Sequence, residues 1–227
     1  MTKALTPLLL TALLLLTATA NAANVTVFGD DVKFTYDDAS LYGSGTVIGN
    51  TIFFTPASFQ AESLNGAGLV QMSESLGITI EITSIGFAMN GFQILEDGDY
   101  EFNGSGASVS AVGELTIDSQ TSAFSDNSVF SAGPLTTSGA LTAWQAGTSL
   151  DLASTAGWNT DAKILMTLAN TLGAETLNPG EQAFIEKKFQ GSAIGITTMI
   201  TPVPVPAAVW LFGSALGLLG WMRRKAC

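Results

Sequence analysis

The stretch Gly77-Ile78-Thr79-Ile80-Glu81-Ile82-Thr83 alternates apolar and polar residues without a break. Successive side chains of a β-strand point to opposite faces, so the three isoleucines share one face of an extended segment. An α-helix, with about 3.6 residues per turn, would spread them around its surface. The stretch therefore predicts a strand whose isoleucines enter a hydrophobic core.

Similar patterns precede this strand. Residues 24–28 and 31–36 alternate on either side of a Gly-Asp pair, and residues 46–48 and 51–54 flank a Gly-Asn pair. Glycine next to Asp or Asn suits the tight turns of β-hairpins. These segments predict two hairpins.

Further strands are expected after it. Residues 87–95 and 100–102 flank Glu96-Asp97-Gly98-Asp99, which reads as an acidic turn. Residues 107–117 continue the alternation. Residues 183–189 and 193–200 predict two antiparallel strands joined at a Gln-Gly turn.

Residues 161–172 fit two patterns. Four apolar residues recur at helical spacing behind Thr160 as a cap, namely Ile164, Leu165, Leu168 and Leu172. Ile164, Met166 and Leu168 also alternate as in a strand. The all-β context favours the strand, while residues 117–158, rich in Ser, Thr, Gly and Ala, predict only short or irregular strands.

Strands recurring about every 8–15 residues, with Gly, Asn and Asp turns between them, predict an all-β fold. We expect an antiparallel β-sandwich, jelly-roll-like, of about nine or ten strands. No second hydrophobic core is evident, so residues 23–200 are expected to form one extracytoplasmic domain.

Charge and composition exclude several functions. The 227 residues carry a net charge of −11, and four lysines stand against all 19 acidic residues once the chain ends are set aside. Nucleic-acid binding is excluded because phosphate contacts need clustered Lys and Arg. The chain has no histidine and one cysteine, Cys227, so it has neither His-dependent catalysis nor an internal disulfide. With no recognisable catalytic motif, the chain is not expected to be an enzyme.

The N-terminal residues 1–22 have the pattern of a secretory signal peptide. Lys3 supplies the positive charge, residues 4–18 form an apolar signal helix, and Ala20-Asn21-Ala22 fits the small-x-small cleavage rule. Cleavage is expected after Ala22, followed by export.

Residues 201–227 have the pattern of a second membrane signal. Alternating prolines at 202, 204 and 206 cannot continue a strand or a helix. Residues 207–221 are apolar apart from one Ser, and they predict a short transmembrane helix. The basic cluster Arg223-Arg224-Lys225 is expected to stop transfer and stay cytoplasmic.

The sequence Val203-Pro204-Val205-Pro206-Ala207, with its apolar run and the basic cluster, resembles the PEP-CTERM sorting domain, in particular its VPLPA-CTERM variant. The resemblance implies an exosortase as partner, cleavage near the prolines, and membrane anchoring before processing. It also implies delivery to the surface or extracellular matrix of a Gram-negative-type bacterium. The family's glutamate is absent and Val205 replaces a leucine, which bears on the exosortase subtype. An ordinary C-terminal membrane anchor is the alternative.

Two groups of residues raise the question of a ligand. Asp97, Asp99 and Glu101 offer oxygen ligands for Ca²⁺, or they form a solvated turn. Five aromatic residues could stack on sugars or fill the core: Trp144, Trp158, Tyr36, Tyr42 and Tyr100. No other cofactor is expected.

The expected function is therefore that of an exported structural protein of the cell surface or matrix, associated with exopolysaccharide. A carbohydrate-binding β-sandwich, assisted by calcium, is the alternative.

Overall fold

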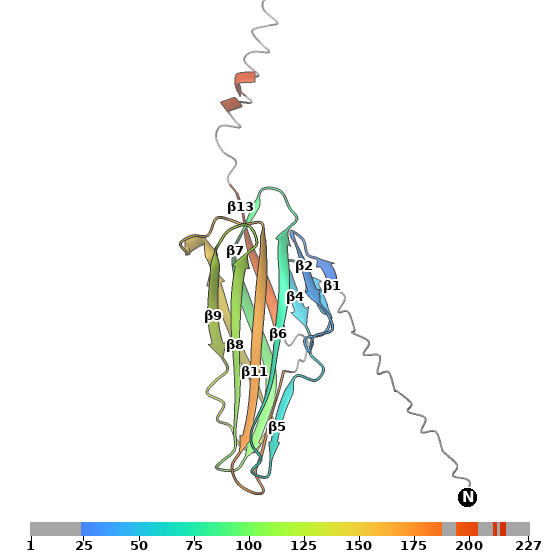
Figure 1. Cartoon of the computed structure of the whole chain (residues 1–227), viewed down its shortest axis with the longest axis vertical. Coiled ribbons are helices and arrows are strands. Elements are labelled where there is room, and N and C mark those ends of the chain that lie inside the picture. The colour runs from blue at the N-terminus through green and yellow to red at the C-terminus, as the bar shows by residue number, and fades with distance from the viewer. Residues whose placement is uncertain (1–23, 188–193, 204–210, 213, 217–227) are drawn as a thin grey trace, which may run out of the picture.

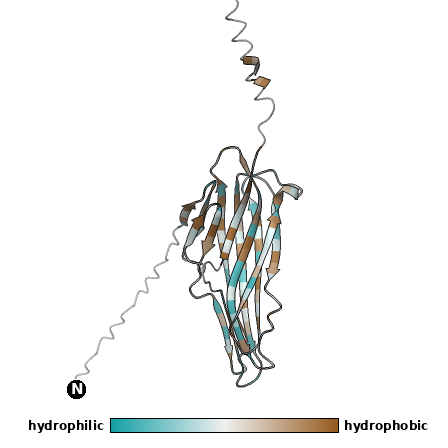
Figure 2. Cartoon of the chain, turned by 180° about the vertical axis from the view of Figure 1, so that it is seen from behind, coloured by the Kyte–Doolittle hydropathy of each residue, from teal (hydrophilic) through white to brown (hydrophobic). Residues whose placement is uncertain are grey.

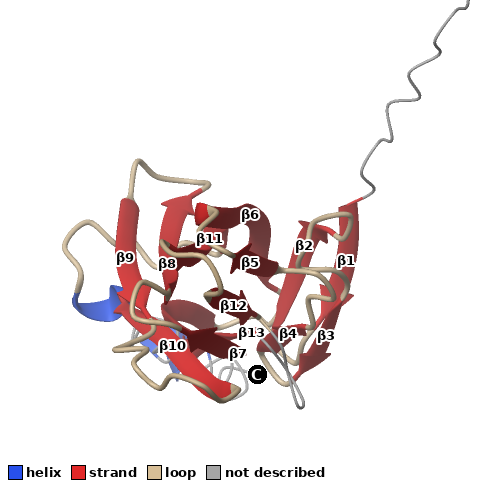
Figure 3. Ribbon diagram, turned by 90° about the horizontal axis from the view of Figure 1, so that it is seen from below, coloured by secondary structure: helices blue, strands red, loops and turns tan. Residues whose placement is uncertain are grey.

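The alternating segments pair into two antiparallel sheets that pack face to face, as the computed structural model shows (Figures 1 and 3). The structure describes residues 24–187, 194–203, 211, 212 and 214–216. The first sheet has the strand order β1 (Asn24–Phe28), β2 (Val32–Asp37), β6 (Gly68–Ile82), β11 (Lys163–Thr176), β8 (Ser108–Ser119) and β9 (Ser125–Ser131).

The second sheet is built around β7 (Phe87–Asn103), its longest strand. The other members are β3 (Gly45–Ile48), β4 (Thr51–Phe54), β5 (Gln60–Leu64), β10 (Thr142–Asp151), β12 (Gln182–Glu186) and β13 (Ile194–Pro202). A short 3₁₀ helix, Leu152–Ser154, follows β10. The antiparallel β-sandwich predicted from the sequence is confirmed, with more strands than expected.

The central strands of the first sheet confirm two sequence predictions. In β6, Ile78 and Ile80 are buried, and they lie opposite Met166 and Ile164 of β11. Residues 163–176 are a strand and not a helix, because their alternate side chains face the core between the sheets. Bands of hydrophobic and hydrophilic residues alternate along the strands in Figure 2, as this arrangement requires.

Both predicted hairpins are also confirmed. β1 pairs with β2 and β3 pairs with β4, each in antiparallel register. Gly49, in the turn between β3 and β4, has a φ of 61°, a left-handed conformation that glycine adopts without strain.

The predicted acidic turn is wrong. β7 runs without a break through Glu96-Asp97-Gly98-Asp99, because both of its edges are paired there. β10 covers residues 91–100 along one edge and is itself ten residues long, so this part of the chain is more regular than expected. Asp97 and Asp99 point outward, whereas Glu96 and Gly98 point into the core.

The predicted pairing of the last two strands is also wrong. Glu186 at the end of β12 lies opposite Asp99, and Ile194 at the start of β13 lies opposite Glu96. Because β10 occupies the other edge of β7, β12 and β13 follow one another along the same edge. They pair with successive parts of β7 and do not form a hairpin with each other.

The two predicted membrane signals lie largely outside the described residues. The signal peptide, residues 1–22, lies there entirely. Within the predicted C-terminal span, residues 211, 212 and 214–216 are helical. Among the described residues, no helix has both the length and the apolar character needed to cross a membrane.

Candidate functional site

Four polar side chains meet in the core between the two sheets. Glu96 comes from β7, Asn170 from β11, Lys187 from the residue after β12, and Tyr42 from the loop between β2 and β3. Their exposed fractions are 1%, 2%, 2% and 0%. We call these four residues the core polar cluster.

The carboxylate of Glu96 is the centre of this cluster. Lys187 Nζ donates a hydrogen bond to Glu96 Oε2 in a buried ion pair. Asn170 Nδ2 donates to Glu96 Oε1 at 2.7 Å and to the Tyr42 hydroxyl at 3.0 Å. The Tyr42 hydroxyl in turn lies 3.3 Å from the carbonyl oxygen of Leu168. Both oxygens of Glu96 are therefore bonded, one to an amine and one to a carboxamide.

Burial affects the other three residues of the cluster in different ways. Within the described part of the chain, Asn170 Oδ1 has no hydrogen-bond partner although it is buried. Burial lowers the pKa of the Lys187 ammonium, and the charge of Glu96 opposes this shift. Burial raises the pKa of the Tyr42 hydroxyl, which therefore stays protonated.

Aromatic rings separate the cluster from water. Lys187 Nζ lies 5.3 Å from the centre of the Trp144 ring and 5.6 Å from that of Phe59. The Trp144 indole donates to the carbonyl oxygen of Glu186 at 3.2 Å, and the Lys187 amide donates to that of Phe59 at 2.9 Å. These bonds fix the chain on both sides of the lysine.

Gly98 allows the Trp144 ring to approach β7 closely. It lies opposite Trp144 in the β7–β10 register, and a Cβ atom here would overlap the Trp144 ring and the carbonyl oxygen of Glu186. Glycine at this position lets the indole cover the strand next to Glu96.

The cluster was not found in the sequence, although a signal is present. Each of its strand residues occupies an inward position in an otherwise apolar series: Asn170 follows Ile164, Met166 and Leu168, and Glu96 follows Phe92 and Ile94. Lys187 likewise continues the inward series of Ala183 and Ile185. A polar residue on the core-facing register of a strand indicates a buried polar group that needs a hydrogen-bond partner.

The three residues considered for calcium lie on one strand. Asp97, Asp99 and Glu101 alternate along the outward face of β7 and are half-buried. Asp97 accepts a hydrogen bond from Gln145 of β10 at 2.9 Å. Within the described ranges, no group of three or more acidic or cysteine side chains is placed to hold a metal ion.

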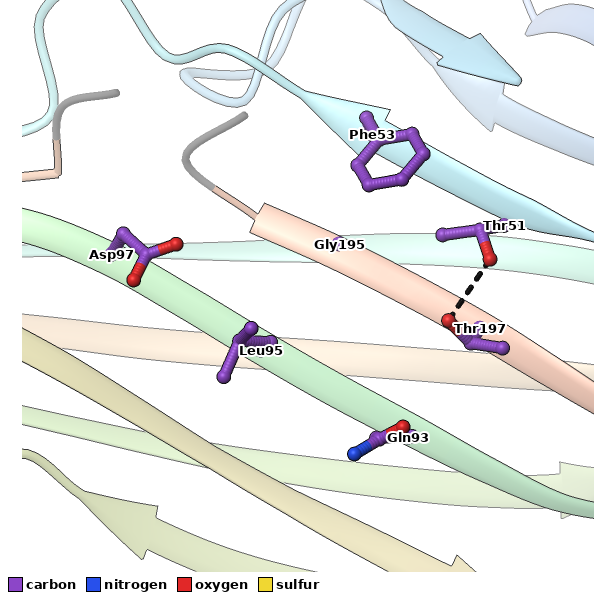
Figure 4. Close-up of a pocket in the computed structure, with 7 residues that line it drawn as sticks. All are labelled: Thr51, Phe53, Gln93, Leu95, Asp97, Gly195 and Thr197. Atoms are coloured by element: carbon purple, nitrogen blue, oxygen red, sulfur yellow. Dashed lines mark hydrogen bonds between the residues drawn. The ribbon is translucent and has the colours of Figure 1, made fainter. Parts of the chain in front are cut away.

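Asp97 also lines a shallow pocket of about 190 Å³ on the outer face of the second sheet (Figure 4). Phe53 of β4 lies against Gly195 of β13, where a Cβ would be 3.2 Å from the ring. The Thr51 and Thr197 hydroxyls are hydrogen-bonded at 2.9 Å. The remaining lining residues are Gln93 and Leu95.

The aromatic residues considered for sugar stacking do not form an exposed platform. Tyr36, Tyr42, Tyr100 and Trp144 are all buried, because they occupy core-facing positions or support the polar cluster. Trp158 is partly buried, and its indole donates to the carbonyl oxygen of Met89 at 3.0 Å. The interpretation of these residues as core is the correct one.

Comparisons with known proteins add little to this geometry. No family model matches the chain, and no curated protein matches it. One solved structure, of infectious bursal disease virus Gt strain, is 11% identical over 77% of this chain and 52% of that chain, with a TM-score of 0.18. The chain thus spans about half the length of that structure, and so low a score carries no argument.

Of the predicted sorting residues, only Val203 is described. Its amide donates to the carbonyl oxygen of Gly86 at 2.7 Å, directly after β13. The others lie outside the described residues: Ala20, Ala22, Pro204, Val205, Pro206, Ala207, Arg223, Arg224 and Lys225.

Proposed function

We propose that the chain is an exported structural protein of the bacterial cell surface or extracellular matrix, sorted through its C-terminal tail by an exosortase. The tail sequence Val203-Pro204-Val205-Pro206-Ala207, followed by an apolar run and a basic cluster, is the observation that carries the proposal. In this proposal residues 1–22 are a signal helix, and the apolar tail is a transmembrane helix until it is processed.

The strand boundaries support this division. β1 begins at Asn24, shortly after the predicted cleavage site at Ala22, and β13 ends at Pro202, immediately before Val203. The prolines that follow in the sequence lack the N–H donors that a β-ladder requires, and a protease needs backbone that is not already paired in a sheet. A jelly-roll-like body is part of the same proposal, since most connections between the described strands cross from one sheet to the other.

Intact-mass measurement of protein extracted from the cell surface tests the sorting. We expect the loss of residues 1–22 and of the segment after Pro206. Replacing Pro204 and Pro206 with Ala should retain the tail, whereas Pro179→Ala, in an exposed loop, should leave processing unchanged. A wild-type surface protein that retains Arg223 to Cys227 contradicts the proposal and favours a plain anchor.

Carbohydrate binding is the second candidate function, and we assign it to the pocket on the second sheet and not to the buried aromatic residues. The pocket on the second sheet combines the Phe53 ring with Gln93, Asp97 and two threonine hydroxyls. An aromatic face beside hydrogen-bonding groups suits a sugar ring.

A glycan array tests this candidate. Binding should be lost in Phe53→Ala and weakened in Asp97→Asn, while Phe28→Ala, at an exposed aromatic residue of β1, should bind as the wild type does. Loss of binding in EDTA would identify a calcium-assisted mode. Absence of binding to every glycan excludes the candidate.

A further inference from the structure

We propose that Lys187 and Asn170 join in an intramolecular amide bond, formed by the protein itself with Glu96 as its catalytic acid and base. The bond links the end of β12 in the second sheet to β11 in the middle of the first. It is independent of the sorting function.

Placement of the three groups is the first argument. One carboxylate binds both the amine of Lys187, through Oε2, and the carboxamide of Asn170, through Oε1 at 2.7 Å. The two oxygens of a carboxylate belong to one carbon, so the nucleophile and the group it attacks are held next to each other. Such positioning replaces a bimolecular encounter by a reaction within one site.

The state of the reacting atoms is the second argument. A lysine amine is a nucleophile only when neutral, and burial among Phe59 and Trp144 favours its neutral form. The carbonyl oxygen of Asn170 has no hydrogen-bond partner among the described residues, so no existing bond has to break when the amine adds to this carbonyl group. The negative charge that develops on the oxygen is balanced by the positive charge on the attached Nζ. Exclusion of water also protects the product from hydrolysis.

The reaction balances without an oxidant or another reactant. Lys187 first transfers a proton to Glu96, which leaves a neutral amine and a neutral acid. Nζ then forms a bond to Cγ of Asn170, Glu96 protonates Nδ2, and the Cγ–Nδ2 bond breaks to release ammonia. Glu96 recovers a proton from Nζ, and the product is a secondary amide that carries no charge.

Formation of the amide bond also removes the desolvation cost of the buried ion pair. A buried ion pair is expensive to desolvate, whereas a neutral amide beside a carboxyl group exchanges ordinary hydrogen bonds with it. Since the only cysteine is Cys227, no disulfide can tie the two sheets together, and the amide bond supplies a covalent link by another route.

The other described lysines do not have this arrangement. Lys33 and Lys163 both pair with Glu81 at the surface, at 3.1 and 3.7 Å, and this carboxylate holds no carboxamide. Conversely, Asn127 donates to Glu114 at 2.8 Å in an exposed pair without a lysine. Within the described residues, the amine, the carboxamide and the carboxylate come together only in the core polar cluster.

Tryptic digestion of the denatured full chain tests the bond directly. In a linear chain, trypsin cuts after Lys163 and Lys187 and releases the peptide 164–187. Acylated Lys187 resists cleavage, so we expect the peptide 164–188, lighter by one ammonia, about 17 Da. In the mass spectrometer, breaking one backbone bond between residues 170 and 187 should not divide this peptide into two fragments. The proposed amide bond closes this part of the chain into a ring, so both sides stay connected.

Each outcome of the wild-type digest decides the question. The linear peptide 164–187 at its full mass overturns the proposal. A loss of water, about 18 Da, with Lys187 joined to the peptide that contains Glu96, overturns the assignment of Asn170 as the partner. The decision does not depend on whether any variant folds.

Variants assign the roles. Glu96→Gln should slow bond formation by about 10²–10⁴-fold, the usual contribution of a general acid and base. The linked fraction over time after synthesis measures this rate. Asn170→Ala and Lys187→Arg should give only linear peptides, and Glu114→Gln, at the exposed carboxylate bound by Asn127, should leave the bond intact. A Glu96→Gln protein that links as fast as the wild type contradicts the role of Glu96.

Discussion

Before the proposed amide bond forms, Glu96 and Lys187 place two formal charges among apolar side chains and aromatic rings, where each ion alone would cost several kcal/mol to desolvate. Their mutual attraction offsets this cost only while both partners are present. The hydrogen bond from Asn170 satisfies the second oxygen of Glu96. The stability of the core thus depends on the cluster being complete.

Glu96→Gln is therefore expected to lower the free energy of unfolding by about 3–5 kcal/mol, because it leaves the Lys187 amine buried without an anion. Loss of the proposed amide bond acts in the same direction. Urea denaturation measures the difference. Glu114→Gln, at an exposed position, should change stability by less than about 0.5 kcal/mol. Equal stability of the two variants would contradict the assigned importance of the pair.

Glu181 determines how stability responds to acid. Its carboxylate accepts hydrogen bonds from the Asn178 side chain at 2.9 Å and from the backbone amides of Gly106, Leu177 and Asn178. Led by the Asn178 side-chain bond, these contacts lower the pKa of Glu181 from its ordinary value of 4.5 to about 2. The ionised form is thus favoured in the folded protein.

A lowered folded pKa stabilises the protein above the unfolded pKa, and the contribution is lost as the pH falls from 4.5 to about 2. Wild type should therefore be more stable than Glu181→Gln near neutral pH, and the gap should close over this range. Thermal midpoints of both proteins at several pH values measure it, with Glu62→Gln as an exposed control. A gap that stays constant down to pH 2 argues against the assignment.

At the scale of elements, local pattern predicted strands well and their partners poorly. The alternating isoleucines predicted residues 77–83 of β6 but not its first half, and residues 161–172 of β11 were assigned to a strand only from the all-β context, because they also fit a helix. β7 was divided in two because Glu96-Asp97-Gly98-Asp99 has the composition of a turn. The strand continues there because β10 pairs with one of its edges over residues 91–100. No residue near position 98 in the sequence indicates this pairing.

Gly98→Ala tests the packing of these elements. The added methyl would overlap the Trp144 ring and the Glu186 carbonyl oxygen, so β7 must move away from its neighbours. We expect a loss of about 1–3 kcal/mol, the usual cost of overpacking. The matched control is Gly77→Ala in β6, where the nearest atom to a new Cβ is 3.8 Å away. Urea denaturation should show a small gain or no change for the control, and equal losses in both variants would refute the close approach at Gly98.

At the scale of the whole molecule, the two candidate sites differ in how far the sequence could predict them. The sorting tail is a contiguous motif, so reading it requires no fold. The core polar cluster joins residues 42, 96, 170 and 187, which only the pairing of distant strands brings together. Its members could be suspected from their inward register, but their meeting depends on the register between β7, β11 and β12, which no local pattern specifies.

The boundaries of the folded body lead to a prediction for the whole chain. All described strands lie between Asn24 and Pro202, so a protein of residues 23–203 keeps every strand pair of both sheets. We expect its thermal midpoint to match that of the full chain to within about 2–4 °C, the shift that 1 kcal/mol produces in a domain of this size. A protein of residues 23–196 is the matched control, because it lacks the part of β13 that pairs with residues between Phe87 and Gln93 of β7. Calorimetry should show a clearly lower midpoint for this shorter chain. If the 23–203 protein is equally destabilised, the terminal segments contribute to the fold and are more than sorting signals.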